Sequence, residues 1–341
     1  MAGPPRTPTL ADVAARAGVS TATVSRCLNA PERVVGPTRE RVLEAVRALG
    51  YSPNFGARAL AAKRTNTIGA VIPSLGNSMY AGGIQAFQDV LAEQGFTLLL
   101  AASGWDAQQE ETQIRALVAR GADGLLLIGD DRDPAIYDFL ALHGVPALTS
   151  WAFPAAPGRT AVGIDNRAAM RGLAETVLAA GHRRLGAIMA PSGGNDRITA
   201  RLCGIHDAMR ATGLNPDDLQ VIETPYGLET GSRAFARMMT RTPRPTAILC
   251  ANDVLAVGAL RQARRMDIAV PEAVSITGFN DMELALIADP PLTTLRVPHA
   301  DMGRLAAQAL VVMVRDGDTP ASVEVPTEVC LRQSLAPPPP D

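Results

Sequence analysis

The spacing of apolar residues changes along the chain and predicts two kinds of structure. Near the N-terminus the stretch TLADVAARAG places Leu10, Val13, Ala14 and Ala17 on one face of a helix. From residue 67 onward this spacing gives way to short, continuous apolar runs bounded by Gly or Pro, beginning with TIGAVIP, FTLLLA, ADGLLLIG and VPALTS. The pattern therefore predicts a small helical head followed by a larger α/β body.

The head contains a second helix directly after the first. Gly18 is a natural left-handed end for the first helix, and Ser20 is placed to cap the next one, predicted over 21–28. In this second helix Val24 and Leu28 turn inward, and the residues facing outward are Thr21, Ala22, Ser25 and Arg26. A third helix, from Pro37 to Gly50, closes the core through Val42, Val46 and Leu49. Two helices joined by a tight turn that contains Gly form a helix-turn-helix, whose second helix suits the DNA major groove.

The body repeats one α/β pattern twice. Continuous apolar runs read as strands buried on both faces, hence as parallel sheets, and helical stretches separate them. A second series of such runs comprises RRLGAIMA, LQVIET, PTAILCA and VSITGF. The final helix carries its apolar stripe on Met302, Leu305, Ala306, Ala309, Leu310 and Met313, and we expect it to cross back to the first lobe. The terminal APPPPD predicts a short disordered tail.

These patterns give provisional domain limits. We expect a helix-turn-helix domain over 1–51, a hinge helix and linker over 52–66, a two-lobed domain over 67–335 and a tail over 336–341. The first lobe is expected to hold about 67–162 plus 297–320, and the second about 163–296 plus 321–335. The chain thus combines an all-α helix-turn-helix head with an α/β domain of two doubly wound lobes.

Charge separates the two parts as well. Residues 1–64 hold ten basic and four acidic side chains, a net charge of +6, and since the whole chain has a net charge of −2 the remainder carries −8. A compact basic head on an acidic body indicates that the head meets a polyanion. The alternative is a solvated, Arg-rich surface with no nucleic-acid partner.

Cysteine and histidine usage narrows the chemistry. Cys27, Cys203, Cys250 and Cys330 are far apart, and the four histidines are equally scattered, so the sequence favours neither a metal site nor a disulfide framework. We expect no cofactor. The N-terminal MAGPPRTPTL has no apolar core of a signal peptide, and no run reaches the length of a membrane span, so we expect a cytoplasmic protein without a membrane partner.

In doubly wound sheets, ligands bind beyond the carboxyl ends of the strands, here in the cleft between the lobes. The residues that follow the predicted strands, with Arg201 on the helix after LGAIMA, are Leu75, Asn77, Met79, Tyr80, Trp151, Asp165, Asn166, Asn252, Asp253, Asn280 and Asp281. Amides and carboxylates beside a flat aromatic ring suit a polyhydroxylated ligand. The alternative for Asp165, Asn252 and Asp253 is that they only cap helices, for Trp151 that it is an ordinary core aromatic, and for Arg201 that it forms a salt bridge across the cleft.

Longer motifs resemble those of a known family. TLADVAARAGVSTATVSRCLN, followed by VLEAVRALGYSPNFGARALAAKRTNTIGAVIP, is similar to the N-terminal signature of the lactose-repressor (LacI) family of bacterial transcription regulators. The similarity continues through GHRRLGAI, CANDVLAVGAL and ITGFNDMELALIADPPLTTLRVP, and NAPERV favours the gluconate-repressor branch. The resemblance implies a homodimer that reads a palindromic double-stranded DNA operator. It also implies a periplasmic-binding-protein-like body whose small effector, a sugar or sugar acid, sets DNA affinity.

The family comparison assigns roles within the head. Arg26 matches the family's base-reading arginine, and its planar fork suits guanine O6 and N7. Thr21 and Ala22 match the positions that vary with the operator. The remaining predicted contacts of the head are Thr9, Ser20, Thr23, Ser25, Asn29 and Tyr51. For Ser20 and Ser25 the alternative is local capping, and for Arg26 it is a solvent-facing charge.

The stretch SPNFGARALAAKRTN connects head and body, and so short a helix is marginal in water unless something holds it. In the family, paired hinge helices enter the minor groove, and Leu60 matches the residue that wedges into the central base step. Ala57 matches the side of close approach, Arg58 and Lys63 are expected on phosphates, and Asn54 completes the predicted hinge contacts. The alternative for Leu60 is a buried linker residue.

In the body, the resemblance implies effector contacts from Arg201 in ARLCG, Asn252 in CAND and Asn280 in GFNDME, with Tyr226 as a stacking aromatic. Two departures change the pocket wall, since GNSMY and SWAF replace the family's usual residues at two strand ends. The effector therefore cannot be copied from a relative.

Two other classes fit the body alone: an α/β enzyme acting on a sugar or nucleoside, and a solute-binding transport protein. Against an enzyme, the sequence lacks a nucleophile elbow, a Walker motif and a dinucleotide fingerprint. The basic head and the missing signal peptide argue against a transport protein.

Overall fold

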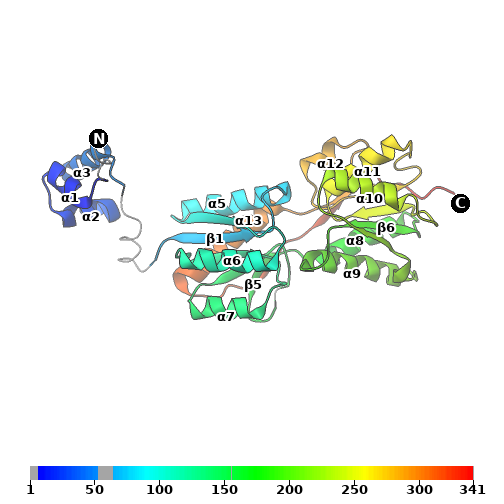
Figure 1. The fold of residues 1–341 in the computed structure, drawn as a ribbon, viewed down its shortest axis with the longest axis horizontal. Coiled ribbons are helices and arrows are strands. Elements are labelled where there is room, and N and C mark those ends of the chain that lie inside the picture. The colour runs from blue at the N-terminus through cyan, green and yellow to red at the C-terminus, as the bar shows by residue number, and fades with distance from the viewer. Residues whose placement is uncertain (1–6, 53–63, 155, 341) are drawn as a thin grey trace, which may run out of the picture. The chain divides into compact units, whose positions relative to one another are not determined.

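The computed structural model describes residues 7–52, 64–154 and 156–340, which form two compact units, 1–65 and 66–341. We describe each unit by itself (Figure 1). Among the described residues, no helix is both long and apolar enough to span a bilayer.

The first unit consists of short helices around a small core. Its elements are α1 (Leu10–Ala17), α2 (Thr21–Asn29), a 3₁₀ turn (Pro31–Arg33) and α3 (Gly36–Leu49). Gly18 ends α1 with φ 65° and Gly50 ends α3 with φ 62°, and the Ser20 side chain caps α2, as predicted. The core is built from all three α-helices: Val13, Ala14, Ala17, Val24, Cys27, Val42 and Ala45.

The first lobe of the second unit is a six-stranded parallel sheet with the order β11-β5-β4-β3-β1-β2. Its strands are β1 (Thr67–Ile72), β2 (Thr97–Ala102), β3 (Gly124–Ile128), β4 (Ala147–Ser150), β5 (Thr160–Gly163) and β11 (Val323–Glu324). Helices α5 (Ala81–Glu93) and α13 (His299–Asp316) cover one face, and α6 (Ala107–Ala119) and α7 (Pro134–Leu142) cover the other (Figure 1). The final helix therefore returns to the first lobe, as predicted. A Cβ on Gly303 of α13 would clash with the Gly83 carbonyl oxygen of α5, so this close packing requires glycine.

The second lobe is a four-stranded parallel sheet with the order β7-β6-β8-β9. Its strands are β6 (Leu185–Met189), β7 (Gln220–Glu223), β8 (Ala247–Cys250) and β9 (Ser275–Thr277). Its helices are α8 (Asn166–Ala179), α9 (Asp196–Ala211), α10 (Leu228–Met238), α11 (Asp253–Arg265) and α12 (Glu283–Ile287). Short 3₁₀ turns lie at Ser78–Tyr80 in the first lobe and at Pro216–Asp218 in the second. In Figure 1, α8 and α9 lie on one side of β6, and α10 and α11 on the other.

The division between the lobes differs from our expectation near the C-terminus. We assigned 321–335 to the second lobe, but β11 pairs with β5 and extends the first sheet. The chain then leaves the first sheet, and β12 (Glu328–Cys330) pairs antiparallel with β10 (Thr294–Arg296). A strand of two residues carries too little periodicity to be assigned from sequence.

The edge strands also depart from the prediction that every strand is buried on both faces. Strands β2 and β7 lie at the edges of their sheets, and both are partly exposed along their length. A parallel sheet has only two edges, so an apolar run alone does not reveal which strands occupy them.

The prediction of a disordered tail over 336–341 is wrong for the part that the structure describes, which ends at residue 340. The Ala336 carbonyl accepts a hydrogen bond from the buried His182 at 2.8 Å and from Ser275 at 3.2 Å. Pro338 packs over Gly181. The proline-rich composition hid this order because proline fixes the backbone without helical or strand periodicity.

Candidate effector cleft and nucleic-acid interface

Helix α2 presents polar and basic side chains to solvent and buries its opposite side in the core of the first unit. Val24 and Cys27 are buried beneath it, while Thr21, Ala22 and Arg26 are exposed and Ser25 is half-buried. This orientation matches the predicted outward face. Cys27 also belongs to this core, although we predicted only Val24 and Leu28 as inward-facing residues of this helix; its spacing of three residues from Val24 is the signal that we missed.

The short polar side chains around α2 hold the helix ends and stay accessible. Ser20 Oγ accepts the Thr23 backbone N–H at 3.1 Å, and Asn29 Nδ2 donates to Ser25 Oγ at 3.3 Å. Thr9 forms a reciprocal cap with Asp12, since its hydroxyl donates to the carboxylate at 2.7 Å and accepts the Asp12 N–H at 3.3 Å. These residues are exposed or half-buried, so capping leaves room for a phosphate contact, which stays a prediction.

The remaining predicted DNA contacts are placed differently. Tyr51 is half-buried against the core of the first unit, and its N–H donates to the Val46 carbonyl at 3.0 Å. The hinge residues Asn54, Ala57, Arg58, Leu60 and Lys63 lie outside the described residues, so their roles stay predictions.

Within the second unit, a cavity of about 610 Å³ opens between the lobes at the carboxyl ends of their strands. Residues of both lobes line it: Ser74, Gly76, Asn77, Ser78 and Trp105 from the first, and Ala190, Pro191, Gly193, Gly194, Asn195, Pro225, Tyr226, Gly227, Asn252 and Val254 from the second. The predicted effector residues among them are Asn77, Tyr226 and Asn252.

Two cavity amides each use their oxygen to cap a helix and keep their nitrogen free. Asn252 Oδ1 accepts the Leu255 N–H at 2.9 Å at the start of α11, and Asn77 Oδ1 accepts the Met79 N–H at 3.3 Å. The buried Nδ2 atoms of both side chains have no hydrogen-bond partner among the described residues. For Asn252 our alternative was that it only caps the helix, but the geometry leaves its Nδ2 available to a ligand while Oδ1 forms the cap.

Among the lining residues that we did not predict, Asn195 and Trp105 bear most directly on ligand binding. Asn195, before α9, is buried with an unpartnered Oδ1, and Trp105, between β2 and α6, is 39% exposed. The Trp105 ring lies 5.5 Å from the Tyr226 ring, which comes from the other lobe. Both residues lie in segments that follow predicted strands. The rule that ligands bind beyond the carboxyl ends of strands, which we call the strand-end rule, would therefore have found them if we had applied it to every strand.

Arg201 lies behind the cavity wall and does not line the cavity. Its Nε donates to Asn166 Oδ1 at 2.9 Å and its Nη1 to the Ala251 carbonyl at 2.7 Å, and the guanidinium stacks on Phe279 at 3.6 Å. Burial lowers the pKa of Arg201 to about 10. Burial also raises the pKa of Tyr226, against the opposing effect of the Arg201 charge.

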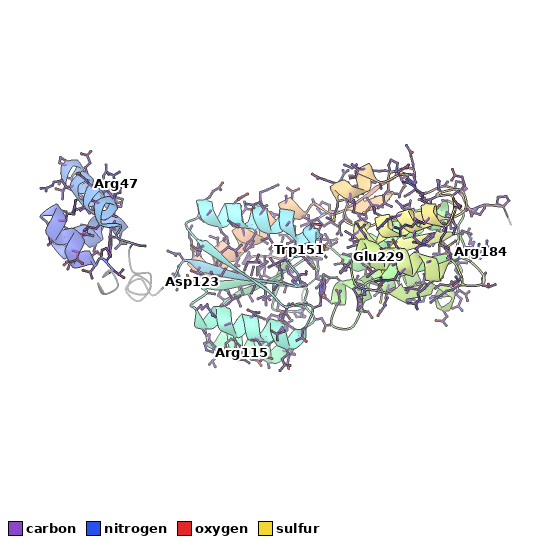
Figure 2. The ribbon with its side chains drawn as sticks, turned by 45° about the horizontal axis from the view of Figure 1, so that its top comes forward. Arg47, Arg115, Asp123, Trp151, Arg184 and Glu229 are labelled. Carbon is purple, nitrogen blue, oxygen red and sulfur yellow. The ribbon has the colours of Figure 1, made fainter. Side chains whose placement is uncertain are left out.

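Trp151 is buried where the lobes meet (Figure 2). Its Nε1 donates to His299 Nδ1 at 3.1 Å, and its ring packs edge-on against Tyr80 with centroids 5.4 Å apart. Burial, together with the nearby positive charge of Arg201, lowers the pKa of His299 to about 4. Trp151 thus has the interior position that the sequence left as its alternative.

The other predicted effector residues also lie off the cavity wall. Met79 and Asn280 are buried together, with Asn280 Nδ2 at 3.9 Å from the Met79 sulfur. Asp165 caps α8 by accepting the N–H groups of Arg167 and Ala168, each at 2.9 Å. Leu75 is 68% exposed. Effector contact by these residues, and by Tyr80, Trp151 and Arg201, stays a prediction.

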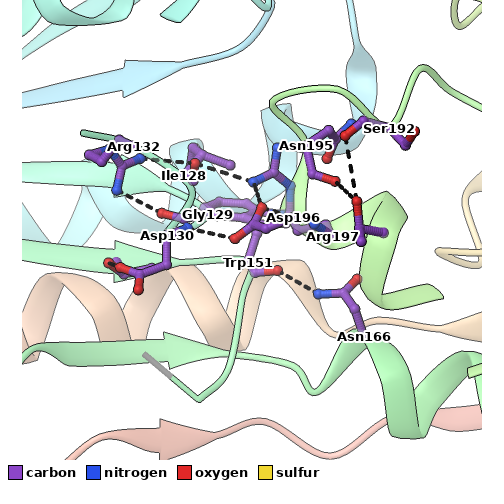
Figure 3. A network of polar contacts seen from close by, with 12 residues as sticks. Ile128, Gly129, Asp130, Arg132, Trp151, Asn166, Ser192, Asn195, Asp196 and Arg197 are labelled. Carbon is purple, nitrogen blue, oxygen red and sulfur yellow. Dashed lines mark hydrogen bonds and ion pairs between the residues drawn. The ribbon is translucent and has the colours of Figure 1, made fainter. Parts of the chain in front are cut away.

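A polar contact joins the lobes beside the cavity (Figure 3). Asp196 at the start of α9 accepts the Asp130 backbone N–H of the first lobe at 2.6 Å. Arg197 donates from Nη1 to the Ile128 carbonyl at 3.3 Å and to the Asp196 carboxylate at 2.7 Å. Gly129, which lies between Ile128 and Asp130, has φ 76°, a conformation that favours glycine, and a Cβ there would meet the ends of the Arg197 and Asp196 side chains. The lobes therefore dock through a pair of charged side chains packed against a backbone position that favours glycine.

Comparisons with known proteins agree with both units. Residues 9–54 match the model of bacterial regulatory proteins of the lacI family, and residues 174–335 match the periplasmic binding protein-like domain. The chain is 33% identical over 305 residues to the HTH-type transcriptional repressor CytR of Escherichia coli, covering 89% of each chain.

Two solved structures share the fold along nearly the whole chain. A Lac repressor dimer bound to operator and an anti-inducer is 25% identical, with a TM-score of 0.84 over 97% of this chain and 100% of that one. A complex of the regulator CelR with cellobiose is 30% identical, with a TM-score of 0.69 over 96% of this chain and 99% of that one.

Proposed function

We propose that this chain, which belongs to the lacI family of bacterial regulatory proteins, is a repressor whose affinity for its DNA operator is set by a small polar effector. The observation that carries the proposal is the exposed face of α2, where Thr21, Ala22 and Arg26 stand free of the core. A helix of this length that presents an arginine fork and short polar side chains suits direct reading of base edges. Of the two effector classes that the family resemblance implies, sugars and sugar acids, the cellobiose in the CelR structure supports a sugar.

The proposed partner is palindromic double-stranded DNA, bound by a homodimer whose two α2 helices read the two half-sites. A Lac repressor relative binds its operator as a dimer, which supports the proposal. The net charge of +6 on residues 1–64 adds attraction to phosphates that salt weakens. Since this partner is chromosomal DNA, we place the protein in the bacterial cytoplasm.

We also propose that the chain is not an enzyme. CytR and CelR, similar along most of their length, are both regulators. No Asp, Glu, His or Lys appears among the described residues that line the cavity, so its wall lacks the carboxylate, imidazole and amine groups that most often act as general acid or base.

The test is selection of duplexes from a random DNA library by the full chain. We expect enrichment of a sequence with dyad symmetry, whose affinity falls steeply as salt rises. Enrichment of no sequence, or equal affinity for selected and scrambled duplexes, contradicts the proposed function.

A further inference from the structure

The wall of the interlobe cavity carries no formal charge in the part of the chain that the structure describes, because no Asp, Glu, Lys, Arg or His lines it. We propose that this cavity takes a neutral ligand with an apolar ring face and several hydroxyl groups, a neutral sugar or a nucleoside, and rejects sugar acids and phosphates. The inference rests on the proposed function for the role of the cleft and narrows its effector class.

The unpartnered amide atoms support a ligand that both donates and accepts hydrogen bonds. Asn77 and Asn252 offer buried N–H donors, and Asn195 offers a buried carbonyl oxygen. A hydroxyl group can satisfy either kind of atom. A carboxylate or phosphate oxygen only accepts, so an anion near Asn195 Oδ1 would leave that acceptor unpaired and repelled.

The two arginines whose charges act on Tyr226 of the cavity wall already donate hydrogen bonds inside the protein. Arg201 is 4% exposed and donates to Asn166 and to the Ala251 carbonyl, and Arg197 is 7% exposed and pairs with Asp196. Neither guanidinium lines the cavity, so to pair with a ligand anion either side chain would have to move towards the cavity and strain or break the hydrogen bonds that now hold it. Buried groups left unpaired in this way carry a large desolvation cost.

The rings of Trp105 and Tyr226 supply the apolar surface. They contact each other at 5.5 Å with a tilt of 41°, one from each lobe, and together form one side of the cavity. Trp105 has φ 67°, an uncommon conformation for a bulky residue, and such strain concentrates at ligand sites. A sugar ring or a nucleobase presents the flat face that packs on such aromatics.

The experiment uses the intrinsic fluorescence of Trp105. The chain has two tryptophans, so Trp151→Phe leaves Trp105 as the only tryptophan of an otherwise complete chain, and excitation selective for tryptophan reports on Trp105. The probes are matched pairs that differ by an acid group: glucose and glucuronate, cellobiose and cellobionate, ribose and ribose 5-phosphate, adenosine and its 5′-monophosphate. Calorimetry of the wild-type chain with the same probes keeps the test valid if the variant folds poorly.

We expect at least one neutral probe to change Trp105 emission, with its acid partner binding at least about tenfold more weakly. The sugar pairs and the nucleoside pair then show which neutral class the cavity prefers. Tighter binding of an acid than of its neutral partner overturns the inference. So does the absence of any response to the neutral probes at about 10 mM, well above a millimolar Kd.

A pair of variants tests the contacts. Trp105→Leu keeps an apolar side chain but removes the ring, and Asn77→Asp keeps the capping oxygen while it replaces the free N–H donor by an acceptor. Each should weaken binding of the neutral probe by about tenfold or more, and unchanged affinity in both contradicts the assigned contacts. DNA selection on the same preparations separates the two proposals. Sequence-specific DNA binding together with tighter binding of the acid probes contradicts only the neutral-ligand inference. Loss of sequence-specific DNA binding contradicts the proposed function.

Discussion

At the scale of single residues, the strand-end rule locates the cleft from the sequence but does not say which side chains face it. Asn77, Tyr226 and Asn252 line the cavity, whereas Arg201 and Trp151 turn into the interior. The direction depends on local backbone conformation, such as φ 61° at Trp151, which no periodicity reveals. Capping positions are better predicted, because a cap involves only neighbours in sequence.

Arg26 gives the sharpest residue-scale prediction for the DNA interface. Arg26→Ala should cost about 1–3 kcal/mol of operator affinity and relax one base position in each half-site, since it removes a fork that pairs with a guanine edge. Competition binding with single-base operator variants measures both effects. Arg47→Ala on α3 is the matched control: it removes the same charge from an exposed position and should change salt dependence without relaxing any base. Equal relaxation in both variants contradicts base reading by Arg26.

Arg201 gives a prediction about stability. Arg201→Ala leaves the Asn166 amide oxygen and the Ala251 carbonyl without their donor and removes the stack on Phe279. Because unsatisfied buried groups cost about 1–3 kcal/mol each, the Tm of the variant should fall by several degrees. Thermal unfolding checks this. A Tm equal to that of the wild type would mean that these contacts do not stabilise the fold and that Arg201 is available to contact the ligand.

At the scale of elements, the helices and central strands follow from apolar spacing, and the errors concentrate where spacing is absent. Strand β11 is too short to show a period, and the segment after β12 is rich in proline. Both are held by contacts distant in sequence, β11 by β5 and Ala336 by His182. Long-range hydrogen bonds of this kind leave no trace in a single sequence.

Truncation tests the role of the C-terminal segment. Deleting 336–341 removes the acceptor for His182 and Ser275, so we expect the free energy of unfolding to fall by about 1–3 kcal/mol. Deleting only 339–341 retains Ala336 and Pro338 and should have little effect. Urea denaturation of both truncations measures the difference, and equal midpoints would contradict a structural role for Ala336.

His299 at the start of α13 predicts a pH dependence. Burial lowers its pKa from 6.5 to about 4, so the folded chain favours the neutral ring. The contribution of the neutral ring to the free energy of unfolding is therefore complete above pH 6.5 and is lost as the pH falls towards 4. Asp253 has the opposite effect on stability. Burial raises its pKa to about 7, so the free-energy cost of ionising this buried carboxyl group in the folded chain grows as the pH rises. The informative quantity is therefore the difference between the wild type and His299→Gln, which keeps an acceptor for Trp151. Between pH 6.5 and 5 the Tm of the wild type should fall more steeply than that of His299→Gln. Parallel profiles of Tm against pH would refute the lowered pKa of His299.

At the scale of the whole second unit, the lobes are joined by polar contacts beside the ligand cavity. Asp196 and Arg197 dock on the backbone at Ile128–Asp130, and residues of both lobes line the adjoining cavity. A ligand that touches both lobes shifts their arrangement only through a difference in its affinity for the alternatives. The charged pair is thus placed to set the equilibrium on which the effector acts.

Asp196→Ala should loosen that docking. The Asp130 amide loses its acceptor, so we expect faster hydrogen exchange at this backbone position. Asp207→Ala removes an equivalent charge from an ion pair with Arg167 inside the second lobe and should leave exchange at Asp130 unchanged. Unchanged protection in Asp196→Ala would show that the contact does not hold the lobes together.

The most direct test of the account is a titration of the selected operator with the full wild-type chain, with and without a saturating neutral probe that binds the cleft. The account predicts that the probe changes the operator Kd by about 5–150-fold, the range of ordinary allosteric coupling. An operator Kd that stays the same while the cleft is demonstrably occupied would contradict it.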